Sequence, residues 1–72
     1  MRNHNYANEI ATANQFVIEH NTDIELMNFL KQLENPMYCH SDRWSQIYDY
    51  MNEHYPSVTG SLITGLAYWV ED

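Results

Sequence analysis

The sequence predicts an all-α protein, a compact bundle of four short helices. Apolar residues recur at steps of three and four along most of the chain, and residues typical of helix starts and ends separate these stretches. Only two glycines and two prolines occur among the 72 residues, and 44% of the residues are hydrophobic, which favours a folded chain over a disordered one. The length allows a single domain, residues 1–72, with residues 1–5 expected to fray. The helices are expected at about 6–19, 23–34, 42–55 and 60–70.

The first helix is predicted from one apolar side. Its small and apolar members, spaced by four, three and four residues, are Tyr6, Ile10, Ala13 and Val17. This spacing aligns them along one face of a helix. The helix is expected to end near Glu19, His20 and Asn21, where the asparagine can serve as a carboxyl-terminal stop.

The second helix has the clearest start. Thr22 and Glu25 have the spacing of a capping box, in which the threonine hydroxyl and the glutamate carboxylate each accept a hydrogen bond from the other residue's amide. A broad apolar stripe follows, formed by Leu26, Phe29, Leu30 and Leu33. The helix is expected to stop before Pro36, which disfavours helical geometry at Asn35.

The third helix has the sharpest division into two faces. Ser41 is expected to cap it and Pro56 to end it. Within an arc of roughly 100° lie Trp44, Ile47, Tyr48, Met51 and Tyr55. On the opposite side lie Asp42, Gln46, Asp49 and Glu53. The helix is therefore apolar on one face and acidic on the other.

The last segment fits a helix through the spacing of Leu62, Leu66 and Val70, but it is also rich in strand-forming residues. Its two glycines each weaken a helix by about 1 kcal/mol relative to alanine. A helix over residues 60–70 is preferred because a lone strand would have no partner, and a strand remains the alternative. Gly60 and Gly65 are expected to let this helix approach a neighbour closely.

Charge and composition exclude several classes of partner. The chain has ten Asp and Glu residues but only three Lys and Arg residues, which gives a formal net charge of −7. Phosphate backbones and anionic membranes should therefore repel the chain, and basic protein surfaces should attract it. Residues 44–72 contain no arginine or lysine, which argues against a helix-turn-helix reader of DNA. No secretory signal or membrane span is expected, and the single cysteine fits a reducing compartment such as the cytoplasm.

The stretch from Cys39 to Asp42 places a thiol beside a histidine, a serine and a carboxylate. Neighbours on a loop rarely face one another as a nucleophile and its base must, and Ser41 and Asp42 already suit a helix start. The four histidines and the cysteine lack the paired spacings of a zinc site. We therefore expect no catalytic residue, no metal and no cofactor, with a thiol or metal site at Cys39 as the weakest alternative.

The acidic face of the third helix is the candidate partner-binding surface. Its residues are Asp42, Gln46, Asp49, Tyr50 and Glu53. At about 1.5 Å per residue, the three carboxylates are spaced by about 10.5 and 6 Å along the helix, and the shorter gap is near the separation of successive phosphates. The alternative is a solvated face that only keeps the protein soluble.

Aromatic residues are more numerous than a core of this size requires, with six tyrosines and two tryptophans. Tyr38, Tyr50 and Tyr68 lie off the predicted apolar faces. Tyrosine is favoured at interfaces, so these residues are expected either to anchor a partner or to complete the core of a homodimer.

In size, acidity and lack of cysteine pairs or catalytic spacings, the chain resembles the small inhibitor proteins that phages and mobile elements use against host defence or nucleic-acid enzymes. The resemblance implies a non-enzymatic inhibitor of the anti-CRISPR or anti-restriction type. It would bind a basic surface of a nucleic-acid-handling protein, with DNA mimicry as one way of doing so, in the cytoplasm of the cell or of the phage's host. The alternative is a helical interaction or regulatory module that acts through an apolar and aromatic surface, with a homodimer as one form.

Overall fold

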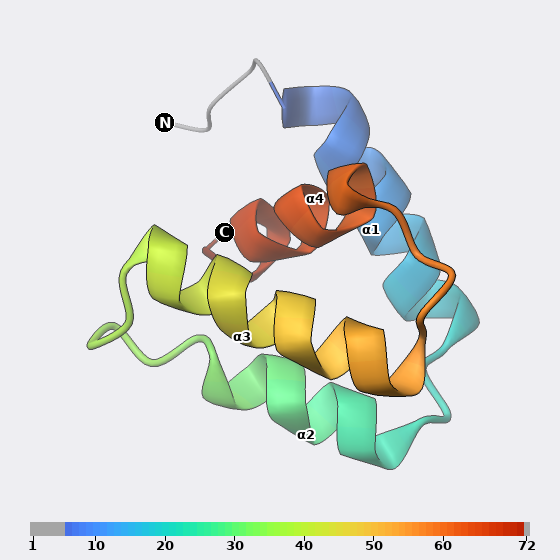
Figure 1. Cartoon of the computed structure of the whole chain (residues 1–72), viewed down its shortest axis with the longest axis horizontal. Helices are drawn as coiled ribbons and strands as arrows, with labels where there is room; N and C mark the ends of the chain where they lie inside the picture. The colour runs from blue at the N-terminus through green and yellow to red at the C-terminus, as the bar shows by residue number, and fades with distance from the viewer. Residues whose placement is uncertain (1–5, 72) are drawn as a thin grey trace.

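The computed structural model describes residues 6–71, and this part of the chain forms four α-helices and no strand (Figure 1). The helices are α1 (Ala7–Glu19), α2 (Ile24–Gln32), α3 (His40–His54) and α4 (Gly60–Glu71). The predicted all-α bundle is confirmed, whereas the strand alternative for the last segment is wrong. The fraying expected at residues 1–5 lies outside the described residues. None of the four helices is long and apolar enough to cross a bilayer.

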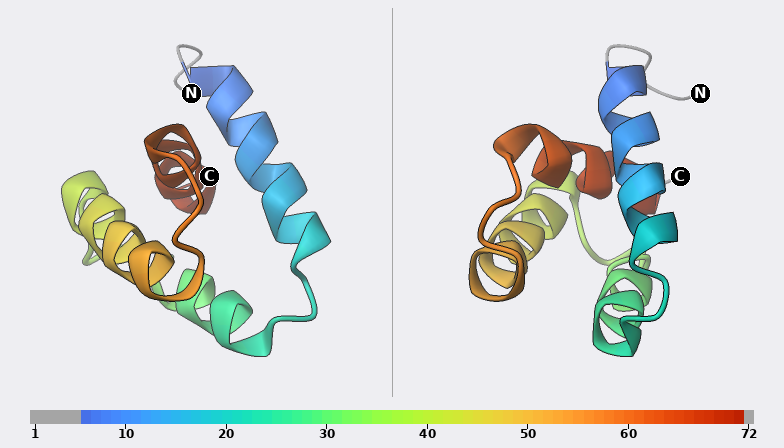
Figure 2. Two further views of the ribbon diagram at one scale, coloured as in Figure 1. Left: turned by 45° about the vertical axis from the view of Figure 1, so that its right-hand side comes forward. Right: turned by 90° about the vertical axis from the view of Figure 1, so that its right-hand side faces the viewer.

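Helix α4 is the centre of the bundle. It packs closely against α1 on one side and α3 on the other (Figure 2). Helix α2 lies alongside α3 and is joined to it by side-chain contacts such as Phe29 with Tyr50 (Figure 1). Eleven hydrophobic residues are buried. They are Ala13, Leu26, Leu30, Leu33, Ile47, Met51, Leu62, Ile63, Leu66, Ala67 and Val70. The last five belong to α4 and follow helical spacing, which explains why this segment is a helix despite its strand-forming residues.

The backbones of α1 and α4 touch at Gly65. A Cβ atom built on Gly65 would lie 2.2 Å from the carbonyl oxygen of Glu9 and 3.3 Å from the Cβ of Ala13. Only glycine fits such a contact between two helices. The expected close approach is therefore confirmed at Gly65, but it is wrong for Gly60, whose added Cβ would meet nothing within 4 Å.

The predicted helix starts need two corrections. Asp23, and not Thr22, precedes α2 and accepts a hydrogen bond from the amide of Leu26 at 3.0 Å. Helix α3 begins at His40 after Cys39, two residues before the predicted position, and the carboxylate of Asp42 accepts from the Cys39 amide at 3.4 Å. At α2 the Asp23 carboxylate takes the place predicted for the Thr22 hydroxyl. At α3 Cys39 and Asp42 form a capping box, and Ser41 lies inside the helix.

The helix ends agree with the prediction to within two residues. Helix α1 ends at Glu19, as predicted, and the residue that closes it is His20 rather than Asn21, since the His20 amide donates to the carbonyls of Phe16 and Val17. Helix α2 ends at Gln32, two residues before the predicted end, and its last turn closes at Leu33.

The sequence predicted the helices better than it predicted which aromatic side chains are buried and which are exposed. Tyr48 was placed on the apolar face of α3, yet it is 44% exposed. Tyr38 and Tyr50 were placed off the apolar faces, yet both are partly buried against the core. Helix α2 lies beside α3 and covers Tyr50. A helical wheel drawn for α3 alone does not include this neighbouring helix.

Replacing Gly65 with alanine should destabilise the fold by about 1–3 kcal/mol, because the new methyl group overlaps the α1 backbone. Gly60→Ala is the matched control and should leave stability unchanged or raise it by up to about 1 kcal/mol, since its position is open and has no positive φ. Urea unfolding followed by circular dichroism measures both. Equal effects of the two variants would contradict the close contact.

Candidate functional site

The predicted acidic face of α3 is present on the surface. Asp42, Asp49 and Glu53 are exposed, and Gln46 is half-buried. Asp42 is bonded to the amide that precedes its own helix, so part of its role is structural. Within residues 6–71, the carboxylates of Asp49 and Glu53 form no hydrogen bond or ion pair. These two are the members of the face that are free to meet a partner.

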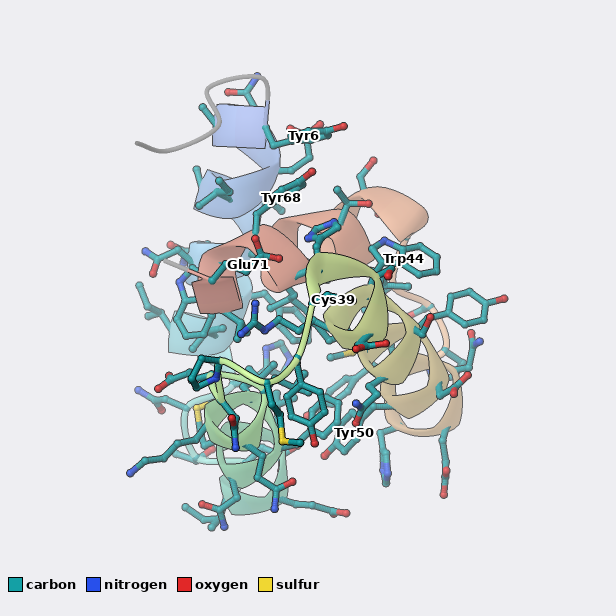
Figure 3. The ribbon with its side chains drawn as sticks, turned by 90° about the vertical axis from the view of Figure 1, so that its left-hand side faces the viewer. Tyr6, Cys39, Trp44, Tyr50, Tyr68 and Glu71 are labelled. Carbon is teal, nitrogen blue, oxygen red and sulfur yellow. The ribbon has the colours of Figure 1, made fainter. Side chains whose placement is uncertain are left out.

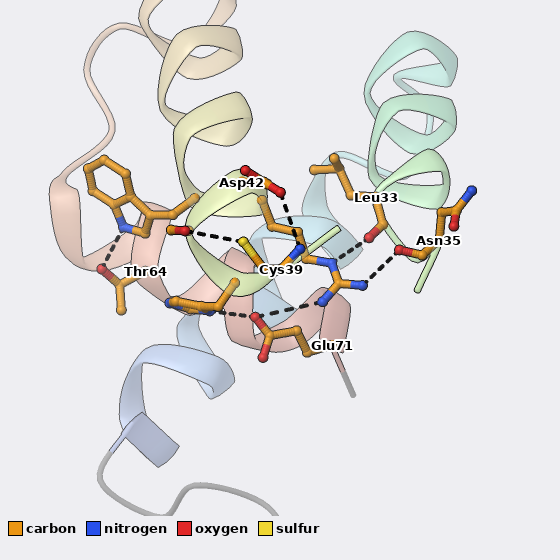
Figure 4. Close-up of polar contacts among 10 residues, drawn as sticks. Leu33, Asn35, Cys39, Asp42, Thr64 and Glu71 are labelled. Carbon is orange, nitrogen blue, oxygen red and sulfur yellow. Dashed lines mark hydrogen bonds and ion pairs between the residues drawn. The ribbon is translucent and has the colours of Figure 1, made fainter. Parts of the chain in front are cut away.

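Arg43, on the same helix, points inward. Its Nε donates to the carbonyl of Leu33 at 2.6 Å and an Nη atom donates to the carbonyl of Asn35 at 3.0 Å (Figure 4). Another Nη lies 4.0 Å from the carboxylate of Glu71, and the side chain is only 11% exposed. The guanidinium thus neutralises the carboxyl end of α2 and joins it to α3 and α4. Its positive charge is largely removed from the surface.

Tyr50 lies between α2 and α3, away from Tyr6 and Tyr68 (Figure 3). Its ring stacks on Phe29 at 4.3 Å and lies 4.3 Å from the ring of His54. Burial raises the pKa of the Tyr50 hydroxyl, and the nearby carboxylates of Glu25, Asp23 and Glu53 raise it further. Of the predicted partner-binding residues, Tyr50 is therefore the one that the fold surrounds with carboxylates from both helices.

Helix α2 supplies residues that the sequence analysis missed. Glu25, Asn28, Phe29 and Gln32, with Tyr50 of α3, line a hollow between the two helices. Their spacing of three and four residues along α2 indicates a common face in the sequence. Only the tertiary structure places that face beside the acidic side of α3.

Asp23 and Tyr55 join the start of α2 to the end of α3. The Tyr55 hydroxyl donates to the Asp23 carboxylate, which also accepts from the Leu26 amide. These two hydrogen bonds, the tyrosine first, hold the pKa of Asp23 below its ordinary value of 3.8. The same bond, together with burial, raises the pKa of Tyr55 to about 12. Asp23 therefore serves the fold, although it is close enough to Tyr50 to add to the negative potential there.

The side chains from Cys39 to Asp42 face different partners. The Cys39 thiol is exposed and lies 3.2 Å from the Ser41 hydroxyl. The His40 ring bonds the Glu71 carboxylate and stacks on Tyr68 at 4.3 Å, so it is not aimed at the thiol. In the part of the chain that the structure describes, no three His, Cys, Asp or Glu side chains gather as a metal site would require.

Tyr68 was expected either to anchor a partner or to complete the core of a homodimer, and in the structure it lies in a stack of three rings. It packs on Tyr6, which directly precedes α1, at 4.5 Å, and on His40. At the other end of α4, the Trp44 indole donates to the Thr64 hydroxyl at 3.1 Å. Many of the surplus aromatic residues are thus used to join helices.

The comparisons with known proteins add no assignment. No family model, no curated protein and no solved structure matches this chain. The site must therefore be interpreted from its own residues.

Replacing Tyr55 with phenylalanine should raise the pKa of Asp23 toward 3.8, because the first of its two hydrogen bonds is lost. The Asp23 contribution to stability is present above pH 3.8 and is lost as pH falls through the lowered pKa. The Tyr55 contribution is present below pH 10.0 and is lost as pH rises toward about 12. In the unmodified protein, the NMR signals of the Asp23 carboxyl group and the Tyr55 ring followed against pH measure both pKa values. In Tyr55→Phe, the carboxyl signal measures the pKa of Asp23. Tyr48→Phe is the control, and an unchanged Asp23 pKa in Tyr55→Phe would contradict the contact.

Replacing Arg43 with glutamine should destabilise the fold by about 2–3 kcal/mol, since two charged hydrogen bonds to carbonyls are lost in a largely buried place. Lys31→Gln removes the same charge from an exposed site and should cost no more than about 0.5 kcal/mol. Urea unfolding of the two variants gives the comparison. Similar stability of both would show that Arg43 is not a structural residue.

Proposed function

We propose that this chain is a non-enzymatic inhibitor that binds a basic surface of a nucleic-acid-binding protein through the side formed by α2 and α3. The main observation in support is the division of charge on this side. Asp49 and Glu53 are exposed and lack partners within residues 6–71, while the one cation of α3, Arg43, is turned inward. The chain presents carboxylates there without the cation that would balance them.

The charge of the whole chain supports the same partner. With a formal net charge of −7, the protein is repelled by nucleic acid and attracted to the grooves that normally hold it. Such attraction speeds the first encounter, and partly buried tyrosine slows dissociation once the surfaces meet. This division of roles fits an inhibitor that competes with nucleic acid for one groove.

Within residues 6–71, no base is aimed at the Cys39 thiol, and this arrangement supports binding over catalysis. His40 is engaged with Glu71 and Tyr68, and Ser41 is the thiol's neighbour. A binding role needs no nucleophile paired with a base. The finer proposal is an inhibitor of the anti-CRISPR or anti-restriction type that acts in the cytoplasm of the phage's host.

A second candidate function rests on the opposite side of α3. Tyr48 is 44% exposed and stacks at 5.3 Å on Trp44, which is partly buried against the core, so an exposed tyrosine ring is available there. A helical module that binds a partner, or a second copy of itself, through this pair is the alternative. Its binding would resist high salt, whereas binding through carboxylates would not.

Reversing the two free carboxylates, Asp49→Lys with Glu53→Lys, should abolish capture of a nucleic-acid-binding protein from nuclease-treated bacterial lysate. The unmodified chain should hold that protein at low salt, release it at high salt and lose it to added duplex DNA. Asp42 is left unchanged because its carboxylate also bonds the Cys39 amide. Affinity capture with mass spectrometry measures the retained proteins, and circular dichroism checks the fold.

Glu19→Lys with Glu34→Lys is the matched control. It makes the same change in net charge at two exposed residues, one on α1 and one beside the carboxyl end of α4. Capture should survive in this variant, though weakened by the loss of overall charge. Equal loss in both double variants, or capture that resists salt and reversal, would contradict the proposal and favour the Trp44 and Tyr48 surface.

A further inference from the structure

The hollow between α2 and α3 has an unusual lining for so small a protein. Its residues are Glu25, Asn28, Phe29, Gln32 and Tyr50. Among them are one carboxylate, two amides and two stacked rings, with ring centres 4.3 Å apart and planes inclined by 12°. The hollow measures about 300 Å³, and Glu53 lies near its Tyr50, three residues further along α3. It is therefore at the low end of the volumes that hold small ligands.

The polar atoms of this hollow are largely acceptors or adaptable groups. The Glu25 side chain is 71% exposed, and its nearest basic group is the His54 ring, 4.0 Å away. Asn28 and Gln32 are exposed and each can turn an amide oxygen toward the hollow. The carboxylates of Asp23 and Glu53 lie near enough to Tyr50 to affect its ionisation. A cation placed here would find several acceptors and an aromatic wall.

We infer that this hollow binds one arginine side chain of a basic protein partner. A guanidinium is planar, presents five N–H donors and stacks on aromatic rings, so it can meet Glu25, one amide oxygen and the Phe29–Tyr50 pair together. A lysine ammonium is a compact charge with three donors and a strong hydration shell, and it uses such a lining less well. The hollow selects arginine, and the neighbouring carboxylates of Asp49 and Glu53 attract the rest of the basic surface.

This inference rests on the proposed function and names the chemistry of the partner. It adds a specific contact from α2 to a surface that was predicted on α3 alone. The two statements can fail separately, because general attraction to a basic peptide does not require the hollow.

The test uses the full chain, labelled with ¹⁵N, titrated at low salt with two blocked peptides, tetra-arginine and tetra-lysine. Tetra-arginine should bind at least about threefold more tightly than tetra-lysine. The largest amide shifts should fall on the residues that line the hollow. Glu25→Gln should weaken tetra-arginine binding by about three- to tenfold and reduce its advantage over tetra-lysine.

Glu19→Gln is the control, with the same loss of charge on α1, and it should change binding less than twofold. Gln32→Ala is a second variant at an exposed position, and it should reduce the preference for arginine without removing attraction to either peptide. Equal affinity for the two peptides, or shifts centred on Asp49 and Glu53 alone, would overturn the hollow while leaving the proposed function standing. No binding of either peptide at low salt would overturn both.

Discussion

The rest of the fold depends on the contact between the backbones of α1 and α4 at Gly65. A chain of this length hides only about 60% of the surface that its unfolded form exposes, so it has few residues to spare for a core. By removing one side chain, the protein brings two helices close enough for α4 to be covered on one side by α1 and on the other by α3. Ala13, the small residue of α1 at the same contact, is fully buried. The central position of α4, which supplies five of the eleven core residues, follows from this approach.

Helix α2 is attached in a different way, and this difference shapes the candidate site. Its two ends are tied to α3 by polar contacts, Asp23 with Tyr55 at the start and Arg43 with two carbonyls at the end. Between these ties the stacked rings of Phe29 and Tyr50 fill the space. Large rings hold the two helices further apart than glycine holds α1 and α4. The hollow is the part of that space which the rings do not fill.

Six carboxylates of α2, α3, α4 and the helix start at Asp23 fall into two groups by what they contact. Asp23, Asp42 and Glu71 accept hydrogen bonds within the fold, at helix starts or from His40. Asp49 and Glu53 have no such contact in the described residues, and Glu25 is mostly exposed. The net charge alone does not reveal this division, and it determines which substitutions would alter binding and which would alter stability. The Arg43 guanidinium is bonded to carbonyls inside the fold. The side of the protein formed by α2 and α3 is therefore more acidic than its sequence suggests.

The sequence by itself determined the all-α class, the four helices and the acidic face of α3, because each depends on the spacing of residues a few positions apart. It also indicated that a glycine of the last segment would meet a neighbour. The tertiary structure decided which neighbour, and it decided that Tyr48 is exposed while Tyr50 is covered. It also turned Arg43 inward and placed the polar face of α2 beside α3. These features depend on which helices are adjacent, and residues such as Phe29 and Tyr50, 21 positions apart, meet only through the packing of the whole bundle.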